Sequence, residues 1–497
     1  AIESDQVIKN YLEPALMYIE RTTLEAKEKD MPENKLYKAF WLAQTESETE
    51  ALTFLDTILA KEKWNNDAVK LKALLLSVLA QQHLEKGQWQ KSREYFIETA
   101  NTYRQASDMA RSYPYNYQSL CAIELNLTMD ALQRTGQDFE IHQQQAIAAC
   151  ESYLKTLPHA LDAQNHLSMI YWLSARWQLS RGKNTDNSLA LARTWNQKSL
   201  DNEYTPQGQR IAAYIELTTA DALQQKGKHV ENHLTNALTI LEELKDKNPH
   251  LGAYLAGDIL YIYSQLIDED LRQLKDIDQW VELAERQYNA FKEGDFHQAE
   301  NIRAVMANMG SVKLSQLYSM KFQGEPYHKA GIQMLPFFEG SQVELNAEPN
   351  VLINHAYVRL LLANLESPDE ALSHVKIAAE LVKQAEKINP ASPVVLLAHA
   401  QLINWQAALG QETFEKADNA FKMVMAVNPE WTVALHMEAE SKLIQSAVLS
   451  EPTAVNDALE EGLNLINKAI SLDPINKTFL KTRDAINQAV KNSLQKN

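Results

Sequence analysis

Five prolines divide much of the sequence into comparable segments, and this repetition most constrains the fold. The prolines at 158, 249, 390, 429 and 474 each follow a stretch with helical periodicity. The residues twelve positions before them are all small: Ala146, Ala237, Ala378, Ala417 and Gly462. The residues eight positions before them are apolar: Cys150, Leu241, Val382, Phe421 and Ile466. A small residue followed four later by a bulky one on the same helical face lets another helix approach closely, which predicts a stack of paired helices.

Length and composition support an elongated helical stack. A chain of 497 residues is too long for one compact core unless its architecture is repetitive. Only 14 Gly and 15 Pro interrupt it, which leaves long helix-compatible stretches and predicts an all-α fold. Breaks at Gly, Pro and Asn place three hairpins in the middle of the chain, at 159–182 with 186–202, 206–227 with 230–247, and 250–270 with 277–293.

The proline-anchored segments resemble the second helix of the tetratricopeptide (TPR) repeat, whose signature is Ala-x3-Phe with a Pro after the helix. After the proline at 158, Leu167-Ser168-x-x-Tyr171 stands where the family has Leu-Gly-x-x-Tyr, whereas Gln164 replaces the family's Trp. The later prolines are 39 (429 − 390) and 45 (474 − 429) residues apart, longer than the family's repeat. The resemblance implies a right-handed superhelical solenoid of antiparallel helical hairpins with a concave binding face.

Residues 162–200 resemble more particularly the long-repeat TPR regions that follow the kinase domain of bacterial Ser/Thr protein kinases. The shared features are a first helix with Tyr171, an Arg181-Gly182-Lys183 turn and a Leu-x-x-Ala second helix. This resemblance implies a signalling role as the regulatory or substrate-recruiting C-terminal region of a larger kinase. The kinase elements His-Arg-Asp and Asp-Phe-Gly do not occur in the sequence, so a kinase domain is not expected within it.

The same patterns predict four parts. Residues 1–65 form an N-terminal helical segment, 66–320 a TPR-like array, 321–349 an irregular break, and 350–497 a second TPR-like array with a C-terminal capping helix. The break is predicted from Gly-x-Pro and Leu-Pro sequences, and self-association through it stays open.

Charge bears on the partners. The formal balance is 48 − 65 = −17, so the surface is expected to repel phosphate backbones, and nucleic acid is excluded as a partner. No run approaches the ~18 apolar residues needed to cross a bilayer, so direct membrane insertion is not expected. Because the chain begins at Ala1 without a Met, we expect a processed product or a piece of something longer.

The two cysteines, Cys121 and Cys150, lie in apolar-periodic helical segments and are predicted to be plain buried thiols. Buried thiols favour a cytoplasmic location weakly, and an extracytoplasmic one stays open if a membrane span precedes this segment. His159 and His166, seven apart, are predicted to be a surface pair because no third metal ligand is near in sequence. The acidic run 268–270 is interpreted as a solvated helix end.

No catalytic signature supports an enzyme. The sequence has no GxxxxGK[ST], GxGxxG, HExxH or CxxC motif, so no catalytic, cofactor-binding or metal-binding residues are predicted. Trp172 and Trp177 are expected to pack between helices, with Trp172 also near the concave face.

The favoured hypothesis is a non-catalytic scaffold that binds a protein or peptide along its concave face. The alternative is a ligand- or peptide-sensing domain whose superhelix closes on binding. Counting past each proline into the next helix gives the candidate partner-binding residues: Asn165, Trp172, Tyr263, Asn404, Trp405, His436 and Glu440.

Overall fold

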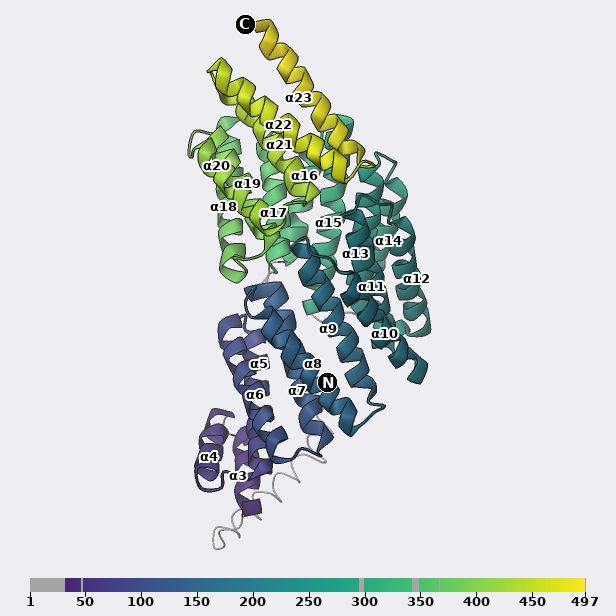
Figure 1. Ribbon diagram of the computed structural model, residues 1–497, viewed down its shortest axis with the longest axis vertical. Helices are drawn as coiled ribbons and strands as arrows, with labels where there is room; N and C mark the ends of the chain where they lie inside the picture. The colour runs from purple at the N-terminus through teal and green to yellow at the C-terminus, as the bar shows by residue number, and fades with distance from the viewer. Residues whose placement is uncertain (1–31, 46–47, 295–298, 342–347, 366, 497) are drawn as a thin grey trace. The chain divides into compact units, whose positions relative to one another are not determined.

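Helices form all the regular structure in the described part of the chain. The computed structural model describes residues 32–45, 48–294, 299–341, 348–365 and 367–496. Consecutive helices there pair as antiparallel hairpins (Figure 1), which confirms the predicted all-α, TPR-like fold. None of the helices in these ranges is both long and apolar enough to span a bilayer.

The chain divides into two compact units, and each is described by itself. Unit 1 comprises Ala1–Asp130 and Phe139–His166, and unit 2 comprises Ala131–Asp138 and Leu167–Asn497. The helices of unit 1 are α3 (Pro32–Thr45), α4 (Glu48–Lys61), α5 (Asn66–Glu85), α6 (Trp89–Met109), α7 (Pro114–Asp130), α8 (Phe139–Thr156) and the first residues of α9 (Leu161–Ser180).

Unit 2 contains the rest of α9 and the later hairpins. Its helices are α10 (Asp186–Asn202), α11 (Pro206–Gln224), α12 (Glu231–Lys247), α13 (Gly252–Arg272), α14 (Asp278–Glu293), α15 (Ala299–Gln323), α16 (His328–Ser341), α17 (Pro349–Ala363), α18 (Pro368–Ile388), α19 (Pro393–Ala408), α20 (Phe414–Val427), α21 (Thr432–Val448), α22 (Pro452–Leu472) and α23 (Lys477–Lys496). The three hairpins predicted in the middle of the chain are confirmed within a few residues at each end. The last described helix, α23, covers the segment that the sequence predicts to be a capping helix.

Cys121 on α7 and Cys150 on α8 form a disulfide, with their Cα atoms 4.9 Å apart. Both are fully buried, as predicted, but the prediction that they are free thiols was wrong. The proline count placed Cys150 on the packing face of α8, and Cys121 occupies the facing position on α7, a juxtaposition that periodicity alone does not reveal. Because disulfides persist in oxidising compartments, the bond removes the argument for a reducing one.

The segment predicted to be irregular, 321–349, contains α16. This helix buries Met334, Leu335 and Phe338 against α15 and α17, as does Tyr327 directly before it, and Pro336 lies within it. The apolar face outweighs the loss of one backbone hydrogen bond at the proline, so the expectation of an irregular stretch was wrong over 328–341. Residues 342–347 lie outside the described ranges.

The first helix of several hairpins ends in the same kind of glycine turn. At the end of α11, Gly227 has φ +67°, and Lys228 N donates to Leu223 O at 3.1 Å. At the end of α9, Gly182 has φ +64°, and Lys183 N donates to Gln178 O at 2.9 Å. A left-handed residue after the last turn lets the backbone satisfy the helix's final carbonyls, and glycine adopts that conformation most easily.

Three such turns of unit 2 contact three turns that precede later helices of the same unit. A Cβ on Gly182 would lie 2.5 Å from Asn428 Oδ1, and one on Gly227 would lie 2.6 Å from Leu472 O. A Cβ on Gly136 would lie 2.9 Å from Asn389 Oδ1 and 2.9 Å from Ala391 Cβ. The glycine turns are 46 (182 − 136) and 45 (227 − 182) residues apart. Successive hairpins therefore dock turn to turn, so that the second array returns against the first within unit 2.

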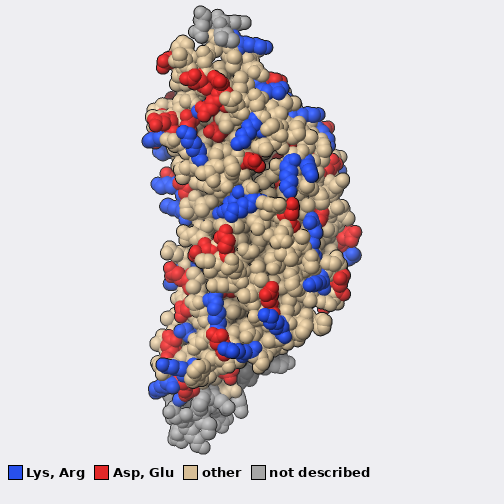
Figure 2. Space-filling model, viewed as in Figure 1, with Lys and Arg blue, Asp and Glu red and all other residues tan. Residues whose placement is uncertain are grey.

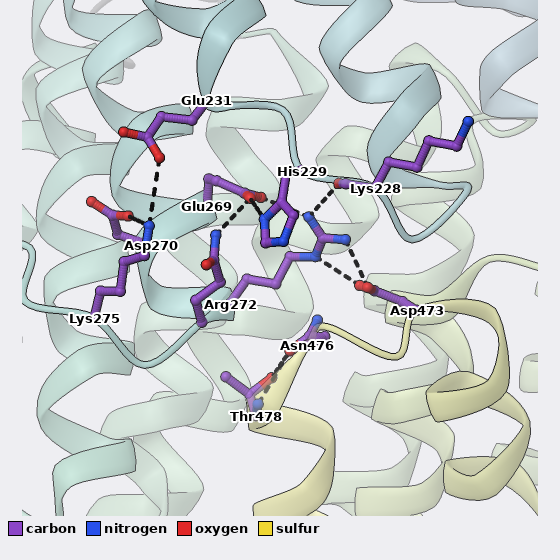
Figure 3. A network of polar contacts seen from close by, with 11 residues as sticks. Lys228, His229, Glu231, Glu269, Asp270, Arg272, Lys275, Asp473, Asn476 and Thr478 are labelled. Atoms are coloured by element: carbon purple, nitrogen blue, oxygen red, sulfur yellow. Dashed lines mark hydrogen bonds and ion pairs between the residues drawn. The ribbon is translucent and has the colours of Figure 1, made fainter.

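A buried ion pair fixes the last of these docked turns. Arg272, at the end of α13 and 4% exposed, donates from Nε and Nη2 to the two carboxylate oxygens of Asp473 at 2.8 and 2.7 Å. Its Nη1 donates to Glu269 at 2.6 Å and to Lys228 O at 3.0 Å (Figure 3). Asp473 is 201 residues away in sequence and follows α22. Residues 269 and 270 are thus buried within a polar network, and their interpretation as a solvated helix end was wrong.

We expect Gly227→Ala to destabilise unit 2 more than Gly410→Ala. Both glycines have positive φ, so each substitution carries a left-handed backbone cost of about 1–2 kcal/mol. At Gly410 an added Cβ meets nothing within 4 Å, whereas at Gly227 it meets the backbone of Leu472 and Asp473. The clash should add about 1–3 kcal/mol. The measurement is the urea midpoint followed by circular dichroism, and equal midpoints would contradict the docking of these turns.

Candidate functional site

Polar side chains from first helices of unit 2 meet where non-consecutive helices approach each other. Lys321 Nζ on α15 lies 3.3 Å from Glu440 Oε1 on α21, although the helices α16 to α20 lie between them in sequence. Lys481 of α23 also contacts the backbone oxygen of Phe322. We name the following half-buried residues the inner cluster: Asp221, Tyr261, Asp268, Tyr318, Lys321, Tyr357, His436 and Glu440.

Several of these residues occupy one equivalent position in successive hairpins. Six residues before the left-handed residue that follows each first helix stand Arg176, Asp221, Asp268, Tyr318 and Asn404. The corresponding left-handed residues are Gly182, Gly227, Leu274, Gly324 and Gly410. Equal distance from the same turn gives these side chains the same direction on their helices. Counting forward from the prolines finds only Asn404 of this column, whereas counting back from the left-handed residues finds all five members.

Two carboxyls of the cluster are strongly desolvated. Burial raises the pKa of Asp268 to about 6, although Ser315 Oγ donates a hydrogen bond to Asp268 Oδ1 at 2.5 Å and acts in the opposite direction. Burial likewise raises the pKa of Asp221 to about 6, and the nearby positive charge of Arg176 offsets only part of this effect. The unit therefore holds acidic groups whose ionised form is poorly stabilised by the protein itself.

Tyrosines surround these carboxyls. Burial raises the pKa of Tyr261 to about 12 and the pKa values of Tyr318 and Tyr357 far above their ordinary range, so the phenols are neutral. The Tyr357 hydroxyl is buried and has no hydrogen-bond partner among the described residues. Leaving such a hydroxyl unsatisfied costs about 1–3 kcal/mol.

At the other end of the cluster the charges are paired. Burial acts to raise the pKa of Glu440, but Lys321 and His436 outweigh it, and the net shift is downward. His436 Nε2 lies 2.8 Å from Thr482 Oγ1, and burial lowers the pKa of this histidine. Glu440 is therefore ionised and already balanced by Lys321. The charge that the cluster leaves uncompensated lies nearer Asp221 and Asp268.

The structure places two predicted binding residues, His436 and Glu440, in the inner cluster. Trp172 lies on α9 and bridges to α11, where its Nε1 donates to Thr218 Oγ1 at 2.8 Å and its ring stacks on Tyr214 at 5.0 Å between centroids. The Arg176 guanidinium lies over the Trp172 ring, 5.5 Å from the ring centroid. Trp172 thus packs between α9 and α11 and stays partly exposed beside Arg176, the first residue of the column.

The other predicted residues lie elsewhere. Tyr263 is 4% exposed, and its ring is 6.4 Å from that of Trp280 on α14, so it packs toward a second helix. Asn404 is fully buried and accepts a hydrogen bond from Ser441 Oγ at 2.6 Å. Trp405 packs partly buried against the core of α17–α19. Asn165, in unit 1, is 2% exposed, so Asn165, Tyr263 and Asn404 present little surface to a partner.

Comparison with known proteins identifies no family. No family model and no curated protein matches the sequence. Among solved structures, a human IFIT1 dimer with m7Gppp-AAAA is similar over 97% of this chain and 94% of that chain, at 12% identity and a TM-score of 0.47. An IFIT1 monomeric mutant with Gppp-AAAA is similar over 97% of this chain and 95% of that chain, at 14% identity and a TM-score of 0.44. A human IFIT1 dimer with PPP-AAAA is similar over 97% of this chain and 94% of that chain, at 12% identity and a TM-score of 0.43.

The exclusion of nucleic acid drawn from the net charge needs correction. The similar structures contain capped or triphosphate-ended RNA, so nucleic acid is no longer excluded as a partner. At these TM-scores the likeness does not decide what this chain binds. A net charge of −17 is also a poor guide to one site, because Lys and Arg are interspersed with Asp and Glu over the face drawn in Figure 2.

We expect Asp268→Asn to flatten part of the pH dependence of stability. The folded pKa is about 6 and the ordinary value 3.8, so between them the folded chain binds more protons than the unfolded chain. The contribution of Asp268 to stability therefore falls as pH rises from about 4 to about 6 and is constant above. Measured by urea unfolding, the free energy of unfolding of the variant should rise relative to that of the parent over this pH range.

Asp457→Asn is the matched control, because Asp457 is exposed on α22. It should leave the shape of the pH profile unchanged. Parallel profiles for the parent and Asp268→Asn would show that this carboxyl is not desolvated as described.

Proposed function

We propose that the chain is a non-catalytic binding scaffold whose inner cluster takes an extended protein segment carrying lysine or arginine side chains. The supporting observation is the pair of desolvated carboxyls, Asp221 and Asp268, with pKa values raised to about 6. A ligand ammonium or guanidinium beside them would favour their ionised form and supply the charge that the protein does not. The partial exposure of both side chains is compatible with such contact.

The neighbouring phenols suit the same ligand. Tyr261, Tyr318 and Tyr357 are neutral aromatic rings that can stack on the alkyl stems and cationic groups of basic side chains. Aromatic rings and carboxyls together therefore favour a basic peptide over an acidic one.

Repeat geometry sets the expected spacing of the basic residues. Neighbouring packed helices lie about 8–10 Å apart, and an extended chain in the polyproline II conformation advances about 3.1 Å per residue with every third side chain on the same face. Asp221 and Asp268 are on α11 and α13, the first helices of consecutive hairpins. We therefore expect basic side chains about three residues apart in the bound segment.

A finer part of the proposal is that this segment serves a larger bacterial Ser/Thr protein kinase as its regulatory or substrate-recruiting region. It is supported only by the sequence resemblance of residues 162–200. The native product would then be heavier than the 56.4 kDa of this chain, which an antibody against the segment can measure in the host. A native band at 56.4 kDa would remove this part and leave the scaffold proposal intact.

We predict that fluorescent peptides with Lys or Arg at every third position bind the chain more tightly than neutral, acidic or respaced peptides of equal length. Asp221→Asn and Asp268→Asn should each weaken binding about tenfold, since each removes one charge contact worth about 1.4 kcal/mol. Affinity should also fall below about pH 6, as both carboxyls become protonated. Fluorescence anisotropy measures all three effects, with Asp457→Asn as the control.

The same assay includes a single-stranded RNA oligonucleotide with and without a 5′-triphosphate. RNA binding that is lost in Lys321→Ala, with no peptide bound, would replace the peptide proposal by a nucleic-acid one. Peptide binding that is insensitive to both Asn substitutions would show that the peptide binds away from the inner cluster.

A further inference from the structure

Three potential metal ligands converge in unit 1 from three different helices. They are Cys121 on α7, Cys150 on α8 and His166 on α9, and their ligand atoms all lie within 4.8 Å of one another. Cys121 Sγ is 3.3 Å from His166 Nδ1. Both cysteines are fully buried and the histidine is half-buried. Thiolate sulfur and imidazole nitrogen are ligands that Zn²⁺ binds strongly.

The separation of sulfur and nitrogen already matches a metal site. Zn–S bonds of about 2.3 Å and Zn–N bonds of about 2.05 Å at a tetrahedral angle put the two ligand atoms about 3.5 Å apart. The 3.3 Å between Cys121 Sγ and His166 Nδ1 is close to that value. Breaking the S–S bond frees both sulfurs to turn toward a shared ion. The imidazole already lies beside one of these sulfurs.

A polar contact beside the cluster holds its third ligand in place independently of the disulfide. Asp162, one turn before His166 on α9, accepts a hydrogen bond from Gln118 Nε2 at 2.7 Å. It also hydrogen-bonds Tyr153. Gln118 is three residues before Cys121, and Tyr153 is three residues after Cys150. Asp162 therefore ties α9 to both cysteine-bearing helices, so His166 should remain next to the sulfurs after reduction.

We propose that this cluster is a redox-dependent metal site, in which reduced Cys121 and Cys150 together with His166 bind one Zn²⁺. A dithiol reductant supplies two electrons and two protons, breaks the S–S bond to give two thiols, and leaves as its own disulfide. Zn²⁺ then binds the two sulfurs and the imidazole nitrogen, and the two thiol protons pass to solvent. The ion keeps one position for water or another ligand. In the oxidised chain the sulfurs are bonded to each other and the site does not form.

The inference is independent of the proposed function, because the cluster lies in unit 1 and the inner cluster in unit 2. It also revises the interpretation of the sequence. The sequence suggests a surface pair of His166 with His159, seven residues earlier. In the structure His159 is exposed, and the residues near His166 are Cys121 and Cys150. Their sequence positions, 45 and 16 residues before His166, give no recognisable metal motif.

The test uses the complete chain, oxidised and after anaerobic reduction, with circular dichroism to compare helix content. Co²⁺ replaces Zn²⁺ as the spectroscopic probe, since thiolate coordination gives a sulfur-to-metal charge-transfer band. We expect one Co²⁺ per reduced chain, displaced by one Zn²⁺, and none per oxidised chain. Zn²⁺ should also raise the thermal midpoint of the reduced chain only.

The variants separate a built site from incidental thiol binding. Cys150→Ser leaves one thiolate ligand and should therefore at least halve the charge-transfer absorbance, and His166→Ala should lower Zn²⁺ affinity at least tenfold. His159→Ala, the matched control at an exposed histidine, should change neither. Equal Zn²⁺ affinity in the parent and His166→Ala, or a reduced wild-type chain that takes up no metal, would overturn the proposal. If reduction lowers helix content and Zn²⁺ does not restore it, the cysteines serve only as a disulfide.

Discussion

The bidentate pair of Arg272 and Asp473 is the interaction on which the arrangement of unit 2 depends. Its partners are far apart in sequence and almost entirely desolvated, so neither charge can be left alone at a tolerable energy. The pair joins the end of α13 to the turn before α23, where the close approach of Gly227 already requires two backbones to touch. An ordinary row of hairpins would have two free ends. Here later hairpins lie against earlier ones, and first helices that are distant in sequence share polar contacts.

That return explains why polar side chains from helices distant in sequence lie together in unit 2. Lys321 reaches Glu440 only because α15 and α21 are brought together. The desolvation of Asp221 and Asp268 and the unpartnered hydroxyl of Tyr357 arise in the same surroundings. A ligand that binds there would replace poor solvation with specific contacts. The proposed site therefore depends on the return of the later hairpins.

Repetition made the helical framework readable from the sequence. Small and bulky residues at fixed distances before Pro249 and Pro429 identify packing faces, and Gly182 and Gly227 mark helix ends, because these properties are local. The same local counting selected His436 and Glu440, two members of the inner cluster, and their role in binding stays a prediction. It failed for Tyr263, since counting from a proline fixes a residue's height on the helix but not which neighbour its side chain faces.

Contacts between distant segments were beyond sequence reasoning. The disulfide between Cys121 and Cys150 and the approach of Asp473 to Arg272 depend on which helices become neighbours, and one sequence does not specify that. Net charge was also misleading, because it averages over the whole chain and says nothing about one sheltered surface. The column from Asp221 to Tyr318 was available in principle, since each member stands at the same distance from a turn.

The docked turns also limit how this chain can change its length. Gly182 and Gly227 lie against partners near Asn428 and Asp473, and both intervals are 45 residues (227 − 182 and 473 − 428). The preceding pair of intervals is unequal, since 46 residues separate Gly136 from Gly182 whereas 39 separate Asn389 from Asn428 (182 − 136 and 428 − 389). The docked turns therefore keep their partners although facing hairpins differ in length. Insertions and deletions should be tolerated at loops away from these turns and excluded from the turns themselves, because each turn glycine lies against one particular partner.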